Sequence, residues 1–111
     1  MSDPAIDPAI FAELQIAAGA EFVTELVGTF LEEAPRMLAE LRSAQAAASA
    51  ERFRRAAHSL KSNSNTFGAL KLGEMARKLE LGGLITDAAR LAALDAEYAR
   101  VAAALKGLCN G

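Results

Sequence analysis

The chain has 111 residues, a formal net charge of −2 at pH 7 and a single cysteine. This length suits one domain with its own core, and the slight negative charge argues against a general nucleic-acid-binding surface. One cysteine excludes an internal disulfide, which agrees with a reducing compartment. The sequence shows neither a signal peptide nor an apolar run of membrane-spanning length. We therefore expect one domain over residues 1–111, in the cytoplasm, without nucleic-acid or membrane partners.

The first part of the sequence predicts a loose tail over residues 1–6 and then two helices. Asp7 before Pro8 indicates a helix start, because aspartate caps free amide groups and proline fits the first turn. Gly19 ends this short helix, and a longer one follows over about residues 20–48. The positions expected to face inward are Phe11, Leu14 and Ala18 in the short helix, and Phe22, Leu26, Phe30, Met37, Leu41 and Ala44 in the long one.

Pro35 lies inside the long helical pattern and lacks the amide hydrogen that would bond to the carbonyl of Leu31. A bend is therefore expected there. Two separate helices are the alternative. We favour one bent helix because the apolar spacing resumes after the proline.

A third helix begins after Ser49, which can cap it, and Glu51 suits its first turn because a negative charge is favourable there. The helix is expected to end around Asn63 to Thr66, where helix propensity falls. Gly68 then marks a turn. We interpret this glycine as a structural position that requires either positive φ or close approach of another backbone.

Two further helices complete the pattern. One covers about residues 69–81 and is stopped by Gly82 and Gly83, and the last is expected to be capped by Thr86. Short connections between long amphipathic helices imply antiparallel neighbours. The expected fold is therefore all-α, an antiparallel four-helix bundle with a short additional N-terminal helix. The inward positions of the last two helices are Leu72, Met75 and Leu79, followed by Leu91, Leu94, Tyr98, Val101, Leu105 and Leu108.

His58, the only histidine of the chain, lies on the third predicted helix. At about 100° per residue, the apolar stripe of this helix contains Phe53, Ala56, Ala57, Leu60 and Ser64. His58 points roughly 140° from the centre of that stripe, and Lys61 roughly 80° from it. His58 is therefore expected in solvent, one helical turn from a lysine.

An exposed imidazole of this kind suits phosphoryl transfer. Because a free imidazole titrates near pH 6.5, it is about three-quarters neutral at pH 7, and its lone pair can attack phosphorus. Lys61 can offer its ammonium to the phosphoryl oxygens, and its charge disfavours protonation of the ring. Ser62, a small residue beside His58, leaves room for a partner.

The stretch from Ala57 to Ala69 resembles the signature of histidine-containing phosphotransfer (HPt) domains, His-x-x-Lys-Gly-x5-Gly between flanking alanines. His58, Lys61 and Gly68 match it, whereas Ser62 stands where the family usually has glycine. The resemblance continues in Phe30-Leu31-Glu32-Glu33-Ala34-Pro35 upstream and Leu79-Glu80 downstream, and so covers nearly the whole chain.

This resemblance implies a phosphoryl carrier in a two-component phosphorelay. His58 would receive the group from an aspartyl phosphate of a receiver domain and pass it to the aspartate of another receiver. The expected partners are response-regulator receiver domains and the receiver of a hybrid histidine kinase, which would supply the Mg²⁺, so this chain binds no cofactor. We expect a monomer. Candidates for docking the partner are Ser62, Asn65, Arg54 and Arg55, although the arginines could equally be ordinary solvated charge.

Most enzyme classes are excluded by what the sequence lacks. There is no Gly-rich phosphate loop, so ATP-dependent kinase activity is not expected, and one histidine with the distant Cys109 supplies no metal-ligand set.

Two alternatives stay open. The first is an HPt-like interaction module that binds a receiver or histidine kinase without carrying phosphate, which Ser62 favours. The second is a domain cut from a larger kinase, against which Met1 and the end soon after the last helix favour a free-standing protein.

Overall fold

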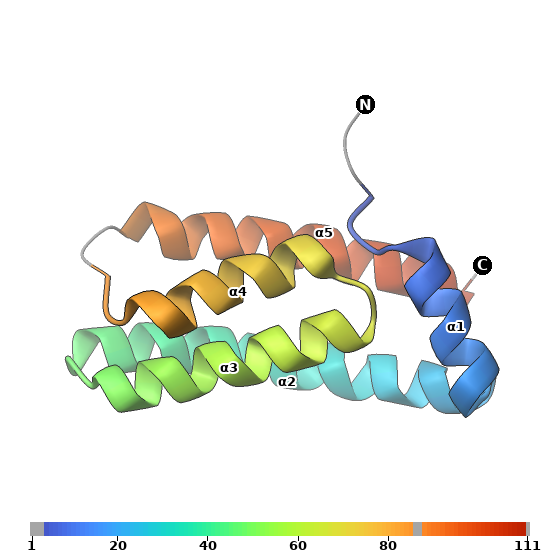
Figure 1. Cartoon of the computed structure of the whole chain (residues 1–111), viewed down its shortest axis with the longest axis horizontal. Coiled ribbons are helices and arrows are strands. Elements are labelled where there is room, and N and C mark those ends of the chain that lie inside the picture. Colours follow the sequence, from blue (N-terminus) through green and yellow to red (C-terminus); the bar gives the residue numbers. More distant parts are fainter. Residues whose placement is uncertain (1–3, 86–87, 111) are drawn as a thin grey trace.

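Four antiparallel helices form a bundle, and a short N-terminal helix packs across one end of it (Figure 1). The structure, a computed structural model, describes residues 4–85 and 88–110, and within these ranges it contains helices and no strand. The expected all-α bundle with an additional N-terminal helix is confirmed. The helices are α1 Pro8–Ala18, α2 Ala20–Ala46, α3 Ala50–Thr66, α4 Leu70–Gly82 and α5 Ala88–Asn110.

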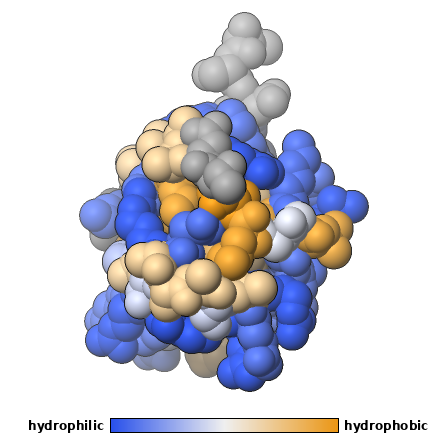
Figure 2. All heavy atoms as spheres, turned by 90° about the vertical axis from the view of Figure 1, so that its left-hand side faces the viewer, coloured by the Kyte–Doolittle hydropathy of each residue, from blue (hydrophilic) through white to orange (hydrophobic). Residues whose placement is uncertain are grey.

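The bundle helices pack in a ring in which α3 joins α2 to α4, and α5 lies between α4 and α2. The pair α3–α4 is in the most extensive contact. A glycine explains part of this closeness, since a Cβ on Gly73 of α4 would lie 2.1 Å from Oδ1 of Asn65 on α3. Figure 2, which looks onto the end of the bundle at the α2–α3 and α4–α5 connections, shows hydrophilic side chains around an apolar centre.

The helix ends follow the predicted signals. Asp7 Oδ1 accepts hydrogen bonds from the amides of Ala9, at 2.9 Å, and of Ile10, at 3.3 Å. Ser49 Oγ accepts one from the Arg52 amide at 3.4 Å. These side chains satisfy amide groups that have no partner within the first turn of a helix. The predicted Thr86 cap lies outside the described residues.

Gly68 has the positive φ expected of it, at 84°. Its carbonyl accepts a hydrogen bond from the Asp7 amide at 2.8 Å, which ties the α3–α4 turn to the start of α1. This bond brings the preceding Ile6 into the core, where it is 4% exposed. The expected loose tail is therefore wrong for Ile6, while residues 1–3 lie outside the described ranges.

Helix α2 is a single helix through Pro35, as favoured from the apolar spacing, but it ends two residues earlier than expected. Ala48 adopts a φ of 55°, outside the right-handed helical region, and turns the chain toward α3. The bend at Pro35 stays a prediction. Phe22 was expected inward and is 51% exposed, because Val23 and Val27 form the buried stripe at this end of the helix.

Most of the other predicted inward positions are buried. Tyr98 is half-buried, with its hydroxyl donating to the Leu31 carbonyl of α2 at 3.4 Å. Leu108 is 44% exposed and Ala18 is exposed, so both predictions are wrong; each residue lies in the last turn of its helix. Leu14, Leu26, Met37 and Met75 are partly buried. The buried set that was predicted is Phe11, Phe30, Leu41, Ala44, Leu72, Leu79, Leu91, Leu94, Val101 and Leu105.

Among the described residues, every helix is too short or too polar to cross a lipid bilayer.

Candidate functional site

His58 lies near the middle of α3 with 57% of its side chain exposed. The exposure follows from the helical period, since the buried positions of α3 are the five of the predicted stripe, Phe53, Ala56, Ala57, Leu60 and Ser64. These residues hold one side of the helix against the bundle and leave the imidazole on the other. The predicted exposure of this side chain is confirmed.

Glu80 of α4 is the closest partner of the histidine. Its Oε2 lies 2.7 Å from Nδ1 of His58, although the two residues are 22 positions apart in the sequence. The Glu80 side chain is only 13% exposed, so the carboxylate is held between the two helices. Sequence reasoning included Glu80 in the family resemblance but gave it no role. The only signal that could have found it was the antiparallel pairing of α3 with α4.

Lys61 completes the cluster from α3. Its ammonium lies 2.9 Å from Oε1 of Glu80, and its side chain is 25% exposed, less than its predicted place beside the wet face suggests. The ammonium of Lys61 and the imidazole of His58 together hold the pKa of the Glu80 carboxyl below its ordinary value, the lysine having the larger effect. The carboxyl group is therefore ionised at neutral pH.

The ionised state of Glu80 decides which nitrogen of the imidazole is reactive. A carboxylate can only accept a hydrogen bond, so Nδ1 of His58 must carry the proton that it donates to Oε2. In the neutral ring the lone pair then resides on Nε2. The exposed side chain thus presents Nε2 with a free lone pair, because Glu80 of the neighbouring helix sets the tautomer of the ring.

The predicted docking residues differ in their surroundings. Ser62 and Arg54 are exposed and lie one turn from His58 on either side of it along α3. Arg55 pairs with Glu51 at 2.6 Å. The amide of Asn65 rests against Gly73 of α4. These side chains lie within about two helical turns of the histidine along α3, and their role in docking stays a prediction.

Among the described residues, no group of three or more histidine, cysteine, aspartate or glutamate side chains is placed to hold a metal ion. The cluster at His58 itself contains one carboxylate and a lysine ammonium.

An exposed histidine on an antiparallel helical bundle, in contact with a carboxylate of the adjacent helix, forms a site on the surface rather than in an enclosed pocket. The sequence profile of the Hpt domain matches residues 25–104, well over half of the chain. This chain therefore belongs to the Hpt domain family, whose members carry phosphoryl groups in phosphorelays and meet receiver domains and kinases there.

A solved structure agrees with that assignment. The crystal structure of histidine-containing phosphotransfer protein B (HptB) from Pseudomonas aeruginosa PAO1 matches with a TM-score of 0.89 and 28% sequence identity. The match covers 98% of this chain and 97% of that one. A search of curated proteins gives no match. The resemblance drawn from the residues around His58 is thus confirmed at the level of family and fold.

Proposed function

We propose that this protein carries a phosphoryl group on Nε2 of His58 between receiver-domain aspartates. The observation that supports the proposal is the contact of 2.7 Å between Nδ1 of His58 and the Glu80 carboxylate, because it leaves Nε2 as the nucleophile on an exposed side chain. The 28% identity to a histidine-containing phosphotransfer protein over nearly the whole chain points the same way.

The transfer is a displacement at phosphorus. The Nε2 lone pair of His58 forms a bond to the phosphorus of an aspartyl phosphate, and the bond from phosphorus to the carboxyl oxygen breaks, so the aspartate leaves as a carboxylate. The ring becomes cationic, since Nδ1 keeps its proton. Glu80 stabilises that positive charge through the same hydrogen bond. In the reverse step an aspartate oxygen bonds to phosphorus, the P–N bond breaks, and its electron pair returns to Nε2.

Lys61 is proposed to stabilise the oxygens of the phosphoryl group. Its ammonium already lies in the cluster, 2.9 Å from Glu80, and the flexible side chain can turn toward a group on Nε2 while staying close to the carboxylate. Phosphoryl transfer depends mainly on positioning and on stabilisation of charge, and a lysine beside the nucleophile supplies both.

The partner is proposed to be a receiver domain that brings the acceptor or donor aspartate and its Mg²⁺. Arg54, Arg55, Ser62 and Asn65 lie around His58 and would meet that domain first. The chain has no Gly-rich phosphate loop for ATP, so we propose a carrier and not a kinase.

The test replaces His58 with glutamine. His58→Gln keeps a polar side chain that can still donate to Glu80, so the free energy of unfolding should change by less than about 0.5 kcal/mol. Incubation with a ³²P-phosphorylated receiver and Mg²⁺ should label the wild type in an acid-labile, alkali-stable form, as expected of a P–N bond. His58→Gln should stay unlabelled. The control Ser59→Ala, which removes the adjacent hydroxyl, should be labelled like the wild type.

The alternative is an interaction module that binds a receiver without accepting phosphate. Ser62 is the residue that favours it, because the family usually has glycine at this position, beside the approach to Nε2. Surface plasmon resonance with the receiver separates the two functions. A wild type that binds the receiver but acquires no label is an interaction module, and label that survives acid would place the modified residue elsewhere.

A further inference from the structure

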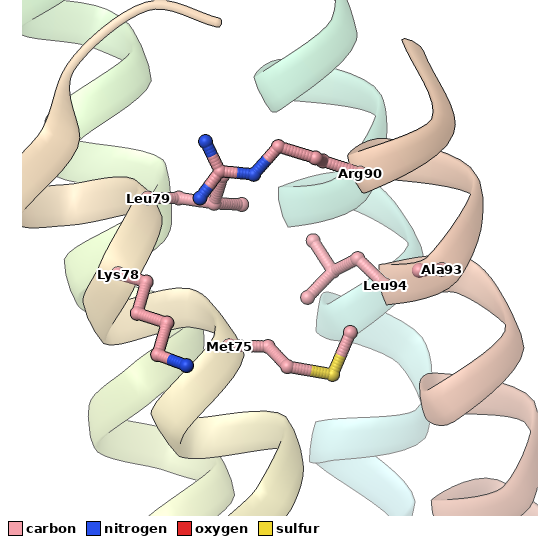
Figure 3. Close-up of a pocket in the computed structure, with 6 residues that line it drawn as sticks. All are labelled: Met75, Lys78, Leu79, Arg90, Ala93 and Leu94. Carbon is pink, nitrogen blue, oxygen red and sulfur yellow. The ribbon is translucent and has the colours of Figure 1, made fainter. Parts of the chain in front are cut away.

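A groove between α4 and α5 lies away from the histidine. Two adjoining pockets of about 240 and 360 Å³ share Met75 and Ala93 and together form it. Its floor is apolar, formed by Met75 and Leu79 of α4 and by Leu94 and alanines of α5 (Figure 3). The small side chains of Ala93 and Ala96 leave the space open, where larger residues would fill it.

The edges of the groove are basic. Lys78 of α4 and Arg90 of α5 flank the first pocket, and Figure 3 shows Arg90 extending from α5 toward Leu79. Neither Lys78 nor Arg90 has a carboxylate within ion-pair distance in the part of the chain that the structure describes. Lys71 and Arg100 line the second pocket. A groove with four basic side chains stands out on a chain whose formal net charge is −2.

Glu97, the carboxylate that lines the second pocket, does not offset the positive charge of Lys78 and Arg90 at the first pocket. Glu97 is 4% exposed, and its Oε1 lies 2.7 Å from Arg100 and 3.8 Å from Lys71, so it forms ion pairs with these two cations of the second pocket. Its Oε2 is buried without a hydrogen-bond partner among the described residues.

The groove and the histidine occupy different sides of α4. At about 100° per residue, Lys71, Met75 and Lys78 share one stripe of the helix, and Glu80 points roughly opposite to them. A molecule in the groove would therefore leave His58 open to a receiver.

We infer that this groove docks an acidic amphipathic helix of a partner protein, as a second binding surface separate from the phosphotransfer face. Grooves with an apolar floor between two helices accept the apolar side of a third helix, and a methionine in the floor adapts to its side chains. The basic edges select acidic flanks. From Lys71 to Lys78 the helix rises by about 10 Å, so the groove takes roughly two turns of partner helix.

The inference can be tested with a fluorescein-labelled helical peptide of about 15 residues, a length at which helices become marginally stable in water. The peptide carries leucines at spacings of three and four residues with glutamates on both flanks. Fluorescence anisotropy should show binding that weakens as salt is added. A scrambled peptide of the same composition, in which leucines and glutamates no longer segregate, should bind far more weakly.

The protein variants locate the binding site. Lys78→Glu with Arg90→Glu should weaken binding about tenfold or more, because both cations become repulsive. Lys106→Glu, a charge reversal on another side of α5, is the matched control and should bind like the wild type. The backbone-amide signals that shift in NMR spectra should belong to α4 and α5.

Phosphoryl transfer should be unchanged in the Lys78 and Arg90 variants, so this test is independent of the proposed function. Failure of the peptide to bind, equal binding of the scrambled peptide, or equal binding by the charge-reversed protein would each overturn the inference. Binding of vesicles that contain phosphatidylserine, without binding of the peptide, would overturn it in favour of a membrane surface. Self-association that depends on Lys78 and Arg90 would overturn it in favour of a second copy of the chain.

Discussion

Glu80 on α4 holds Nδ1 of His58 on α3 at 2.7 Å, and the same carboxylate holds the Lys61 ammonium at 2.9 Å. One largely buried group thus orients the imidazole and positions the nearest cation. The reactivity proposed for Nε2 would therefore depend on how α3 packs against α4, and not only on the motif along α3.

Replacing Glu80 with glutamine should slow phosphoryl transfer while keeping the fold. The amide is nearly the same size but can either donate or accept, so it no longer requires the proton of His58 on Nδ1. We expect a roughly tenfold to hundredfold lower transfer rate, the range found when a carboxylate that orients a metal-bound imidazole is lost. Rapid-quench measurement with a phosphorylated receiver gives the rate, and ¹⁵N NMR of the ring gives the tautomer.

The matched control for Glu80→Gln is Glu32→Gln, on an exposed position of α2. It should transfer at the wild-type rate. An unchanged rate and an unchanged tautomer in Glu80→Gln would show that Glu80 does not orient the ring.

Lys61→Met should slow phosphoryl transfer, because it removes the charge while keeping the apolar stem of the side chain. It should also lower the thermal stability at pH 7, since Glu80 loses the cation that lies 2.9 Å from it. Lys61→Arg retains the charge, and its transfer rate should lie between those of Lys61→Met and the wild type. Circular dichroism follows unfolding, and the labelling assay follows transfer. If Lys61→Met transfers as fast as the wild type, the lysine has no electrostatic role.

Acid should weaken the protein partly through Glu80. Its pKa is lowered in the folded state by Lys61 and His58, so below the ordinary value of 4.5 the unfolded chain binds the proton first. The stabilisation is therefore fully present above about pH 4.5 and is lost as the pH falls through the folded-state pKa. Urea unfolding between pH 7 and pH 3 should show a shallower acid decline in Glu80→Gln than in the wild type. Parallel declines would mean that other carboxylates account for it.

Gly68→Ala should destabilise the protein by about 1–2 kcal/mol or more, because an L-residue is strained at positive φ. The new Cβ would also lie 3.0 Å from the Asp7 carbonyl oxygen and 3.1 Å from Cβ of Ile10. The control Gly28→Ala, in the middle of α2 with nothing within 4 Å of the added Cβ, should stabilise by about 0.5–1 kcal/mol. Guanidinium unfolding measures both changes, and equal effects would show that Gly68 has no special backbone role.

Local patterns predicted much of this molecule. Asp7 and Ser49 cap helices, Gly68 adopts positive φ, and His58 is exposed, each as expected from neighbouring residues and from the period of a helix. The family followed from the spacing of His58, Lys61 and Gly68. The same reasoning failed where the apolar choices were nearly equivalent, as at Phe22, where the buried stripe passes instead through Val23 and Val27.

The sequence by itself determined the helices, their order and the exposed histidine, because these depend on patterns within a few residues along one helix. Only the tertiary structure decided that Glu80 meets His58 and Lys61, and that Lys71, Lys78, Arg90 and Arg100 edge a single groove. Both arrangements depend on the register of one helix against another. That register is set by the packing of side chains such as Asn65 against Gly73, which no periodicity within one helix can specify.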